Sequence, residues 1–256
     1  MNLLFELCFL FFIGSVSGWV AELFYRRFFS DANPGRKWIN PGFCTGPYLP
    51  LYGVGLGLVY LITVFGKRHL PSDSYGSDLF LIVCMSIAMT VVEYIAGILA
   101  LKVVKVRLWD YRKRRGNIQG IICPMFSLIW AGGSAIYYFF LHPLIERNLL
   151  QRLVGNDAAV FALGLFFGVF IVDVAHSVRL IEKLRRFANE NDVIVKFENI
   201  KAQIRLHHEK TAQKYHFFRP FSSDKLLAEH LKEMLESFET RRRDDLEKIR
   251  NRKEKR

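Results

Sequence analysis

The sequence predicts an all-α membrane protein with five transmembrane helices, a two-fold parallel internal repeat and a cytosolic helical C-terminal extension. Three observations support this fold class: five long apolar runs, two stretches with matched landmark residues, and a charged composition after about residue 179. Of the 256 residues 51% are hydrophobic, yet the net charge is +12, so the two kinds of residue are segregated. The alternative, a soluble helical protein, needs helices with a polar face, and these runs have none.

Each apolar run is close to the ~20 residues that a helix needs to cross a bilayer. The runs are Leu3–Phe24, Pro47–Gly66, Leu79–Leu101, Ile118–Leu141 and Ala158–Ala175. The first run is expected to be an uncleaved helix rather than a signal peptide, because basic residues follow it instead of preceding it. The predicted domains are therefore a transmembrane domain over 1–178 and a basic helical extension over 179–256.

The internal repeat consists of two copies, at about 3–66 and 79–141, followed by a fifth span at about 158–175. The first copy contains Glu22, Trp38, Asn40, Pro47, Leu51 and Gly55; the second contains Glu93, Trp109, Asn117, Pro124, Leu128 and Gly132. Glu and Trp are 16 residues apart in both copies (38 − 22 and 109 − 93), and Asn precedes Pro, Leu and Gly by 7, 11 and 15 in both. Duplications in membrane proteins commonly frame a site between the halves.

Basic residues in every second loop predict the orientation. The loops after the first and third runs contain Arg26, Arg27 and the stretch 112–115, whereas the loop between them has two basic residues opposed by Asp73 and Asp78. We expect a multi-pass protein of the cell membrane with its N-terminus outside and its C-terminus in the cytoplasm. Both copies then cross the bilayer in the same direction, which makes the repeat parallel.

Four residues are the candidate substrate-binding site: Glu22, Glu93, Asn40 and Asn117. A carboxylate within a transmembrane helix is costly and usually faces protein or a polar cavity. Each Asn precedes a helix start rich in Pro or Gly, and its side chain is expected to cap that start and leave N–H groups free for an anion. The alternatives are a Glu22 that reaches the headgroups, a structural hydrogen bond between the halves, and caps without a further role.

Other polar and small residues are expected to be structural. Asp173 and His176 lie one turn apart and are predicted to form an ion pair, with a proton relay as the alternative. The glycines at 53, 55 and 57, and those at 132 and 133, are predicted to allow close helix packing. The four cysteines have no C-x-x-C spacing, so no metal site is expected.

The C-terminal extension carries 21 basic and 14 acidic residues, a net charge of +7 (21 − 14). Helical spacing is visible at Leu180–Phe187 and Val193–Leu206, and Leu227, Leu231, Met234 and Phe238 form a coiled-coil-like seam. We expect a homo-oligomer or partner contact through this seam. We expect the basic extension to bind anionic lipid of the bilayer rather than nucleic acid, because acidic residues are interspersed in it and its aromatic residues are few.

Two groups of motifs resemble the CmpB-type putative ABC transporter permeases (putative ABC-transporter type IV). The first comprises Gly18-Trp19 with Glu22, Asn40-Pro41-Gly42-Phe43, Gly46-Pro47 and Pro50-Leu51-Tyr52-Gly53; the second comprises Glu93-Tyr94, Trp109-Asp110-Tyr111 and Asn117-Ile118-Gln119-Gly120. The resemblance covers roughly residues 5–175, and the chain departs from it at 112–115 and in its extension. It implies a multispan bacterial membrane protein of the permease type.

The sequence contains no G-x-x-x-x-G-K-[ST] motif, so any ATPase is expected to be a separate ATP-binding-cassette subunit. The first functional hypothesis is a transporter component of unknown substrate. The second is a membrane scaffold or sensor that acts through the C-terminal helices. The third is a membrane-embedded enzyme on a lipid substrate with the two glutamates as acid and base, which the spans do not favour because they contain no nucleophile–base pair. No catalytic residue and no cofactor are expected.

Overall fold

The computed structural model describes residues 3–30, 33, 35–42, 44–71, 74–103, 105–146, 152–153, 155–190 and 195–196. It is mostly helical, and five of its helical segments are long and apolar enough to cross a membrane. These candidate spans are Leu3–Phe28, Pro50–His69, Tyr75–Val103, Pro124–Leu144 and Asp157–Val178. The prediction of five apolar helices is therefore confirmed, whereas the internal repeat stays a prediction.

The helices are α1 (Leu3–Phe28), α2 (Pro50–His69), α3 (Tyr75–Val103), α4 (Pro124–Ile136), the π-helix η1 (Tyr137–Leu141), α5 (His142–Leu144) and α7 (Asp157–Glu190). The fourth span consists of α4, η1 and α5. α7 continues to Glu190, 12 residues past the candidate span that ends at Val178 (190 − 178), so the helical pattern at Leu180–Phe187 belongs to the same helix.

A two-residue strand, β1 (Val106–Arg107), pairs in parallel with β2 (Val195–Lys196). The helical pattern predicted over Val193–Leu206 is therefore wrong at these two residues of β2. The rest of that range lies outside the described residues, as does the seam of Leu227, Leu231, Met234 and Phe238.

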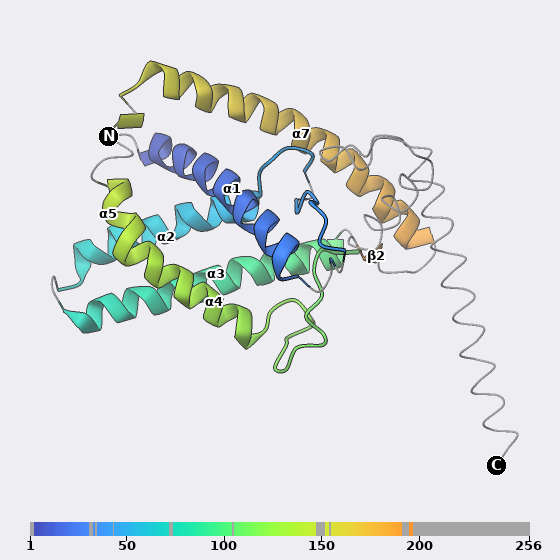
Figure 1. Cartoon of the computed structure of the whole chain (residues 1–256), viewed down its shortest axis with the longest axis horizontal. Helices are drawn as coiled ribbons and strands as arrows, with labels where there is room; N and C mark the ends of the chain where they lie inside the picture. Colours follow the sequence, from blue (N-terminus) through green and yellow to red (C-terminus); the bar gives the residue numbers. More distant parts are fainter. Residues whose placement is uncertain are drawn as a thin grey trace, which may run out of the picture.

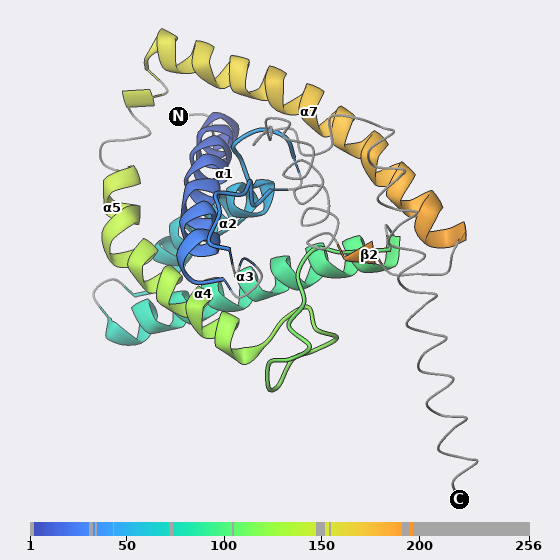
Figure 2. The same ribbon diagram turned by 45° about the vertical axis from the view of Figure 1, so that its right-hand side comes forward.

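The first four spans form a bundle in which α1 packs on α2, α2 on α3, and α3 on α4. α7 runs along the outside of this bundle and contacts α1, as Figures 1 and 2 show from two directions. Aromatic contacts join the two, because the ring of Phe11 packs against Phe167 and Phe170. The buried apolar core comprises Phe9, Leu10, Val59, Tyr60, Leu81, Met85, Met89, Tyr137, Tyr138, Ile145 and Leu163.

Small residues bring α1 and α2 into close contact. A Cβ atom on Gly14 would lie 2.8 Å from the carbonyl oxygen of Tyr52, and one on Gly18 would overlap the side chain of Tyr52. A Cβ atom on Gly53 would overlap the hydroxyl of Ser15. Close backbone approach through small residues is a common way to pack helices in membranes. It places Tyr52 of α2 directly against the last turns of α1.

The predicted packing role holds for Gly53 and Gly55 but not for Gly132 and Gly133. A Cβ atom on Gly55 would lie 2.6 Å from the terminal methyl group of Met89 in α3. By contrast, no atom of the described residues lies within 4 Å of a Cβ on Gly132 or on Gly133, and both residues are exposed on α4. The prediction failed because equal spacing from a preceding Asn does not give equal helix faces.

Candidate functional site

Glu22 lies near the end of α1, where it accepts hydrogen bonds from two elements. The hydroxyl of Tyr52 in α2 donates to Oε2 over 3.2 Å, and Nε of Arg26 donates to Oε1 over 3.0 Å. The Glu22 side chain is 22% exposed, so its ion pair with Arg26 is only partly shielded from solvent. Both carboxylate oxygens of Glu22 are therefore bound within the protein.

Glu93 lies deeper, in the interior turns of α3, and is 4% exposed. The hydroxyl of Tyr111 donates to Oε1 over 3.1 Å, and the indole N–H of Trp130 in α4 donates to Oε2 over 2.9 Å. Burial and the nearby charge of Glu93 raise the pKa of Tyr111, which therefore stays a neutral donor. Glu93 forms no ion pair with any residue that the structure describes.

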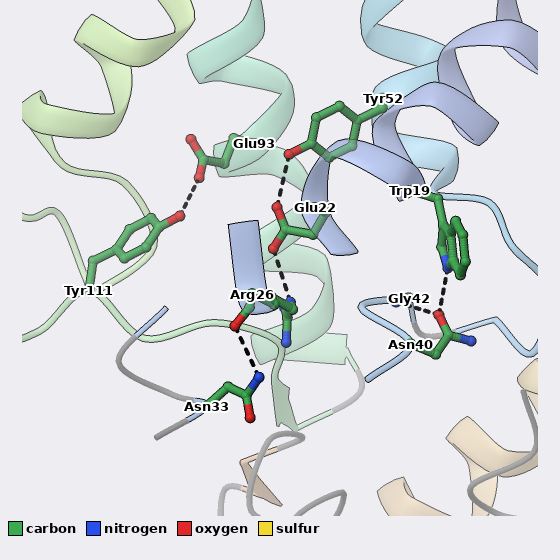
Figure 3. A network of polar contacts seen from close by, with 9 residues as sticks. All are labelled: Trp19, Glu22, Arg26, Asn33, Asn40, Gly42, Tyr52, Glu93 and Tyr111. Carbon is green, nitrogen blue, oxygen red and sulfur yellow. Dashed lines mark hydrogen bonds and ion pairs between the residues drawn. The ribbon is translucent and has the colours of Figure 1, made fainter. Parts of the chain in front are cut away.

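Tyr52 and Trp130 join these two carboxylates. Their rings pack with centroids 5.8 Å apart, and each donates a hydrogen bond to a different glutamate. Figure 3 shows Glu22 bound by Tyr52 and Arg26, and Glu93 bound by Tyr111. We refer to Glu22, Arg26, Tyr52, Glu93, Tyr111 and Trp130 as the shared polar cluster, to which both proposed halves of the chain contribute.

Asn40 lies outside this cluster, in the loop between α1 and α2, and is 2% exposed. Its Oδ1 accepts hydrogen bonds from the indole of Trp19 over 2.8 Å and from the backbone N–H of Gly42 over 3.0 Å, as Figure 3 shows. Its amide group donates to the carbonyl oxygens of Cys44 and Thr45. Asn40 therefore holds the loop against α1.

The prediction that Asn40 caps a helix start is wrong. α2 begins at Pro50, and its N-cap residue is Leu49, which makes no side-chain capping bond. The helix begins late because the Pro- and Gly-rich segment before it is held as a loop by other hydrogen bonds. The fixed φ angle of Pro50 suits the first turn of a helix, where an N–H group is not needed.

The same correction applies to Asn117. α4 begins at Pro124 after Cys123, again without a side-chain cap. Asn117 instead donates to the carbonyl oxygens of Arg112 and Arg114 and accepts from the N–H of Gly120. It fixes the basic loop at residues 112–115.

A tight turn at Gln119 and Gly120 follows Asn117. Both residues have positive φ angles, 55° and 69°, as the two central residues of a type I′ turn require. The N–H of Ile121 donates to the carbonyl of Ile118, and the N–H of Ile118 donates to the carbonyl of Ile122. This turn explains why the apolar run starting at Ile118 is not helical before Pro124.

Asp173 of α7 binds the loop before α2. Its carboxylate accepts hydrogen bonds from the backbone N–H groups of Thr45, over 3.1 Å, and Gly46, over 2.8 Å, and from the hydroxyl of Tyr48. The predicted ion pair with His176 is wrong, since among the described contacts of these two residues none joins them and His176 is exposed. The free N–H groups expected in this loop are occupied by the chain's own carboxylate.

Burial around this contact changes the chemistry of two loop residues. It raises the pKa of the Cys44 thiol to about 11, with a further contribution from the charge of Asp173. Burial and the hydrogen bond to Asp173 also raise the pKa of Tyr48. Both groups are therefore neutral at physiological pH, and Asp173 faces donors rather than a second negative charge.

Sequence reasoning missed the residues that complete the shared polar cluster. Tyr52 and Tyr111 stand within the motifs that resemble the family, and Trp130 lies outside them. None of the three is among the four predicted site residues. The hydrogen bonds join residues 18 to 37 positions apart (Tyr111–Glu93, Tyr52–Glu22 and Trp130–Glu93). A signal was present, since Tyr and Trp are the aromatic residues that can satisfy a buried carboxylate from an apolar helix.

No curated protein and no solved structure matches the chain. A sequence model of the family described as putative ABC-transporter type IV matches residues 9–178. The matched segment begins within α1, ends at the last residue of the fifth candidate span and includes every member of the shared polar cluster. With its five apolar helices and this match over most of its length, the chain is a multi-pass membrane protein that belongs to the putative ABC-transporter type IV family.

Proposed function

We propose that the chain is the membrane-spanning component of a transporter and that Glu22 and Glu93 bind the substrate or a coupling ion. The observation that carries the proposal is that residues from α1, α2, α3 and α4 converge on two carboxylates in one cluster. Ionisable residues inside membrane helices commonly mark substrate or ion pathways. Asn40 and Asn117 are kept out of the binding site, because their side chains are committed to loop backbone.

The chemistry of the cluster favours a cation or a substrate with a positively charged group. Arg26 neutralises Glu22, but Glu93 has no ion-pair partner in the described part of the chain. The rings of Tyr52, Tyr111 and Trp130 lie beside the carboxylates, and aromatic faces attract cations. Since Glu93 is 4% exposed, access to it requires the bundle to open, as transport by alternating access does.

A separate ATP-binding-cassette subunit is the proposed source of energy, because the chain has no Walker A motif. The basic loop 112–115 and the extension after Val178 are the proposed docking region, on the cytoplasmic side in the orientation that loop charges predict. The bilayer and, through the extension, a second copy of the chain are the other proposed partners.

The test is purification of the full chain in a mild detergent, with identification of any bound ATP-binding-cassette protein and measurement of ATP hydrolysis by the complex. We expect Glu93→Gln to leave assembly intact and to change ATP hydrolysis about tenfold or more, with Glu22→Gln acting in the same direction. If the two glutamates share a site, ATP hydrolysis in the double variant should differ from the native rate by no more than it does in the more severe single variant. Asp157→Asn, in the exposed first turn of α7 and outside the proposed docking region, is the matched control. Absence of such a subunit, or unchanged hydrolysis in both variants, would contradict the proposal.

A scaffold or sensor is the second candidate, and one observation favours it. α7 is a single helix from the candidate span to Glu190, and Asp173 within it binds the backbone of Thr45 and Gly46. Movement of the loop before α2 would therefore be transmitted along α7 toward the extension. A chain that purifies without an ATPase, but whose extension changes its protease sensitivity in Asp173→Asn, would support this candidate instead.

A further inference from the structure

A second polar cluster lies at the other end of the bundle and has no residue in common with the shared polar cluster. It consists of Glu6 of α1, Tyr60 of α2, Tyr137 of η1, His142 of α5, and Glu146. Glu6 precedes Glu22 by 16 residues (22 − 6), which is roughly 24 Å along a helix. We refer to these five residues as the His142 cluster.

The π-helix η1 explains why this cluster is buried. Pro143 has no backbone N–H and cannot continue a regular helical ladder, and the N–H of His142 bonds to the carbonyl of Tyr137, five residues earlier. The wider turn lets two consecutive residues, Tyr137 and Tyr138, face the core at 4% and 7% exposure. Single π-turns inside helices occur frequently at functional sites.

His142 is fully buried, at 0% exposure, and its two ring nitrogens have different surroundings. Nδ1 lies 3.0 Å from the hydroxyl oxygen of Tyr137, with which it shares a hydrogen bond. Nε2 has no hydrogen-bond partner among the described residues. A carboxylate oxygen of Glu146 lies 3.5 Å from Nε2, and the Glu146 side chain is 59% exposed.

We propose that His142 is a proton-binding site, loaded at Nε2 from the solvent through the carboxyl group of Glu146. The proposed step starts from the neutral ring with its hydrogen on Nδ1, donated to the oxygen of Tyr137, so that Nε2 carries the lone pair. Glu146 takes one proton from a hydronium ion of the solvent, which leaves water, and passes it to Nε2. In the resulting imidazolium both ring nitrogens are donors, Nδ1 to the oxygen of Tyr137 and Nε2 toward the carboxylate of Glu146. Imidazole is the side chain best suited to exchange protons near neutral pH.

The charged and titratable groups around His142 come from α1, α2, α3 and the residue that follows the fourth span, Glu146. Glu6 of α1 accepts a 2.8 Å hydrogen bond from Tyr60 of α2, whose ring centroid lies 6.0 Å from that of His142. Lys67 of α2 and Glu146 are the charged groups that interact with the His142 ring. The residues that α7 packs here are apolar, Val160 and Leu163 among them. Asp78 of α3 is bound to Tyr138, the neighbour of Tyr137.

Of these groups, Glu146 is the one whose removal tests the proposal without harm to the fold, because its side chain is largely exposed. Glu6 and Tyr60 lie within the core, where substitutions also remove packing. An opposite charge within about 4–6 Å of a titrating group changes its proton affinity by tenfold or more.

The experiment is nitrogen-15 NMR of the full chain with labelled histidine, in lipid nanodiscs, from about pH 2.5 to about pH 8. The His142 ring signals are assigned by their loss in His142→Gln. We expect them to titrate to the imidazolium form, and Glu146→Gln to lower the proton affinity of His142 about tenfold. Glu182→Gln is the control and should leave the His142 titration unchanged. His142 signals that keep one neutral tautomer over the whole range, or that titrate identically in Glu146→Gln, would overturn the proposal.

Discussion

Tyr52 of α2 and Trp130 of α4 pack with ring centroids 5.8 Å apart, and each donates its single polar hydrogen to a different buried or half-buried carboxylate. The pair therefore links Glu22 of α1 to Glu93 of α3 through residues of α2 and α4. Among the described residues, no hydrogen bond joins the two carboxylates directly. The arrangement makes the position of each carboxylate depend on the contact between two aromatic rings.

Trp130→Phe should expose this dependence, because it keeps an aromatic ring but removes the donor to Glu93. We expect a loss of about 1.5–3 kcal/mol in the free energy of unfolding, the usual range for a hydrogen bond to a charged group. Thermal unfolding in detergent, scored by helical circular dichroism, measures it. In the Glu93→Gln background the same substitution should cost much less. Equal costs in both backgrounds would mean that the indole stabilises by packing alone.

Gly18→Ala should separate α1 from α2. The added Cβ atom would overlap the side chain of Tyr52, which itself is held against Glu22, so the overlap cannot be relieved by a small rotation. We expect a loss of about 1–3 kcal/mol, typical of overpacking in a well-packed core. Gly132→Ala is the matched control, since nothing lies within 4 Å of its added atom, and Ala favours helix there. A neutral Gly18→Ala would contradict the close contact of the two helices.

The sequence predicts which segments form the spanning helices, but not the residues at which the second and fourth of them begin. Hydropathy placed the second and fourth spans at Pro47 and Ile118, whereas α2 begins at Pro50 and α4 at Pro124. Apolar residues of a loop that is folded onto the bundle have the same hydropathy as those of a helix. The loops are fixed instead by Asn40, Asn117 and Asp173, whose partners are backbone groups that no residue pattern identifies.

The sequence predicts the two glutamates of the candidate site but not the residues that bind them. A Glu in an apolar run is visible in any sequence, which singles out Glu22 and Glu93, and the structure links them through the packed rings of Tyr52 and Trp130. Their partners Tyr52, Tyr111 and Trp130 reach them only through tertiary packing. The two asparagines matched in spacing, yet Asn40 bonds to carbonyls that follow it and Asn117 to carbonyls that precede it. Spacing alone does not fix the direction of a side chain.

Labelling of the Cys44 thiol should be slow at neutral pH and should accelerate as the pH rises. With a pKa of about 11, only about one thiol in a thousand is ionised at pH 8, and the thiolate is the reactive form. The rate measured with a membrane-permeant reagent, after replacement of the other three cysteines, should rise about tenfold per pH unit below that value. Asp173→Asn removes a neighbouring negative charge, which should lower the pKa and increase the rate. A rate that is independent of pH would show that access, not ionisation, limits the reaction.

The orientation that the loop charges predict can be tested with two single cysteines on a background in which Cys8, Cys44, Cys84 and Cys123 are replaced. Tyr75→Cys lies at the start of α3, where the native side chain is 94% exposed, and Arg114→Cys lies in the basic loop before α4. These two positions lie at opposite ends of the third span.

If the basic loops face the cytoplasm, an impermeant thiol reagent added to intact cells should label the cysteine at position 75 and not the one at position 114. After the cells are opened both should react, which shows that each cysteine is accessible in itself. The exposure of Tyr75 makes slow labelling of that position in intact cells informative, because burial within the bundle cannot account for it. The reverse pattern would place the shared polar cluster at the outer side of the membrane and the His142 cluster at the inner side. The proton that His142 is proposed to bind would then enter from the cytoplasm.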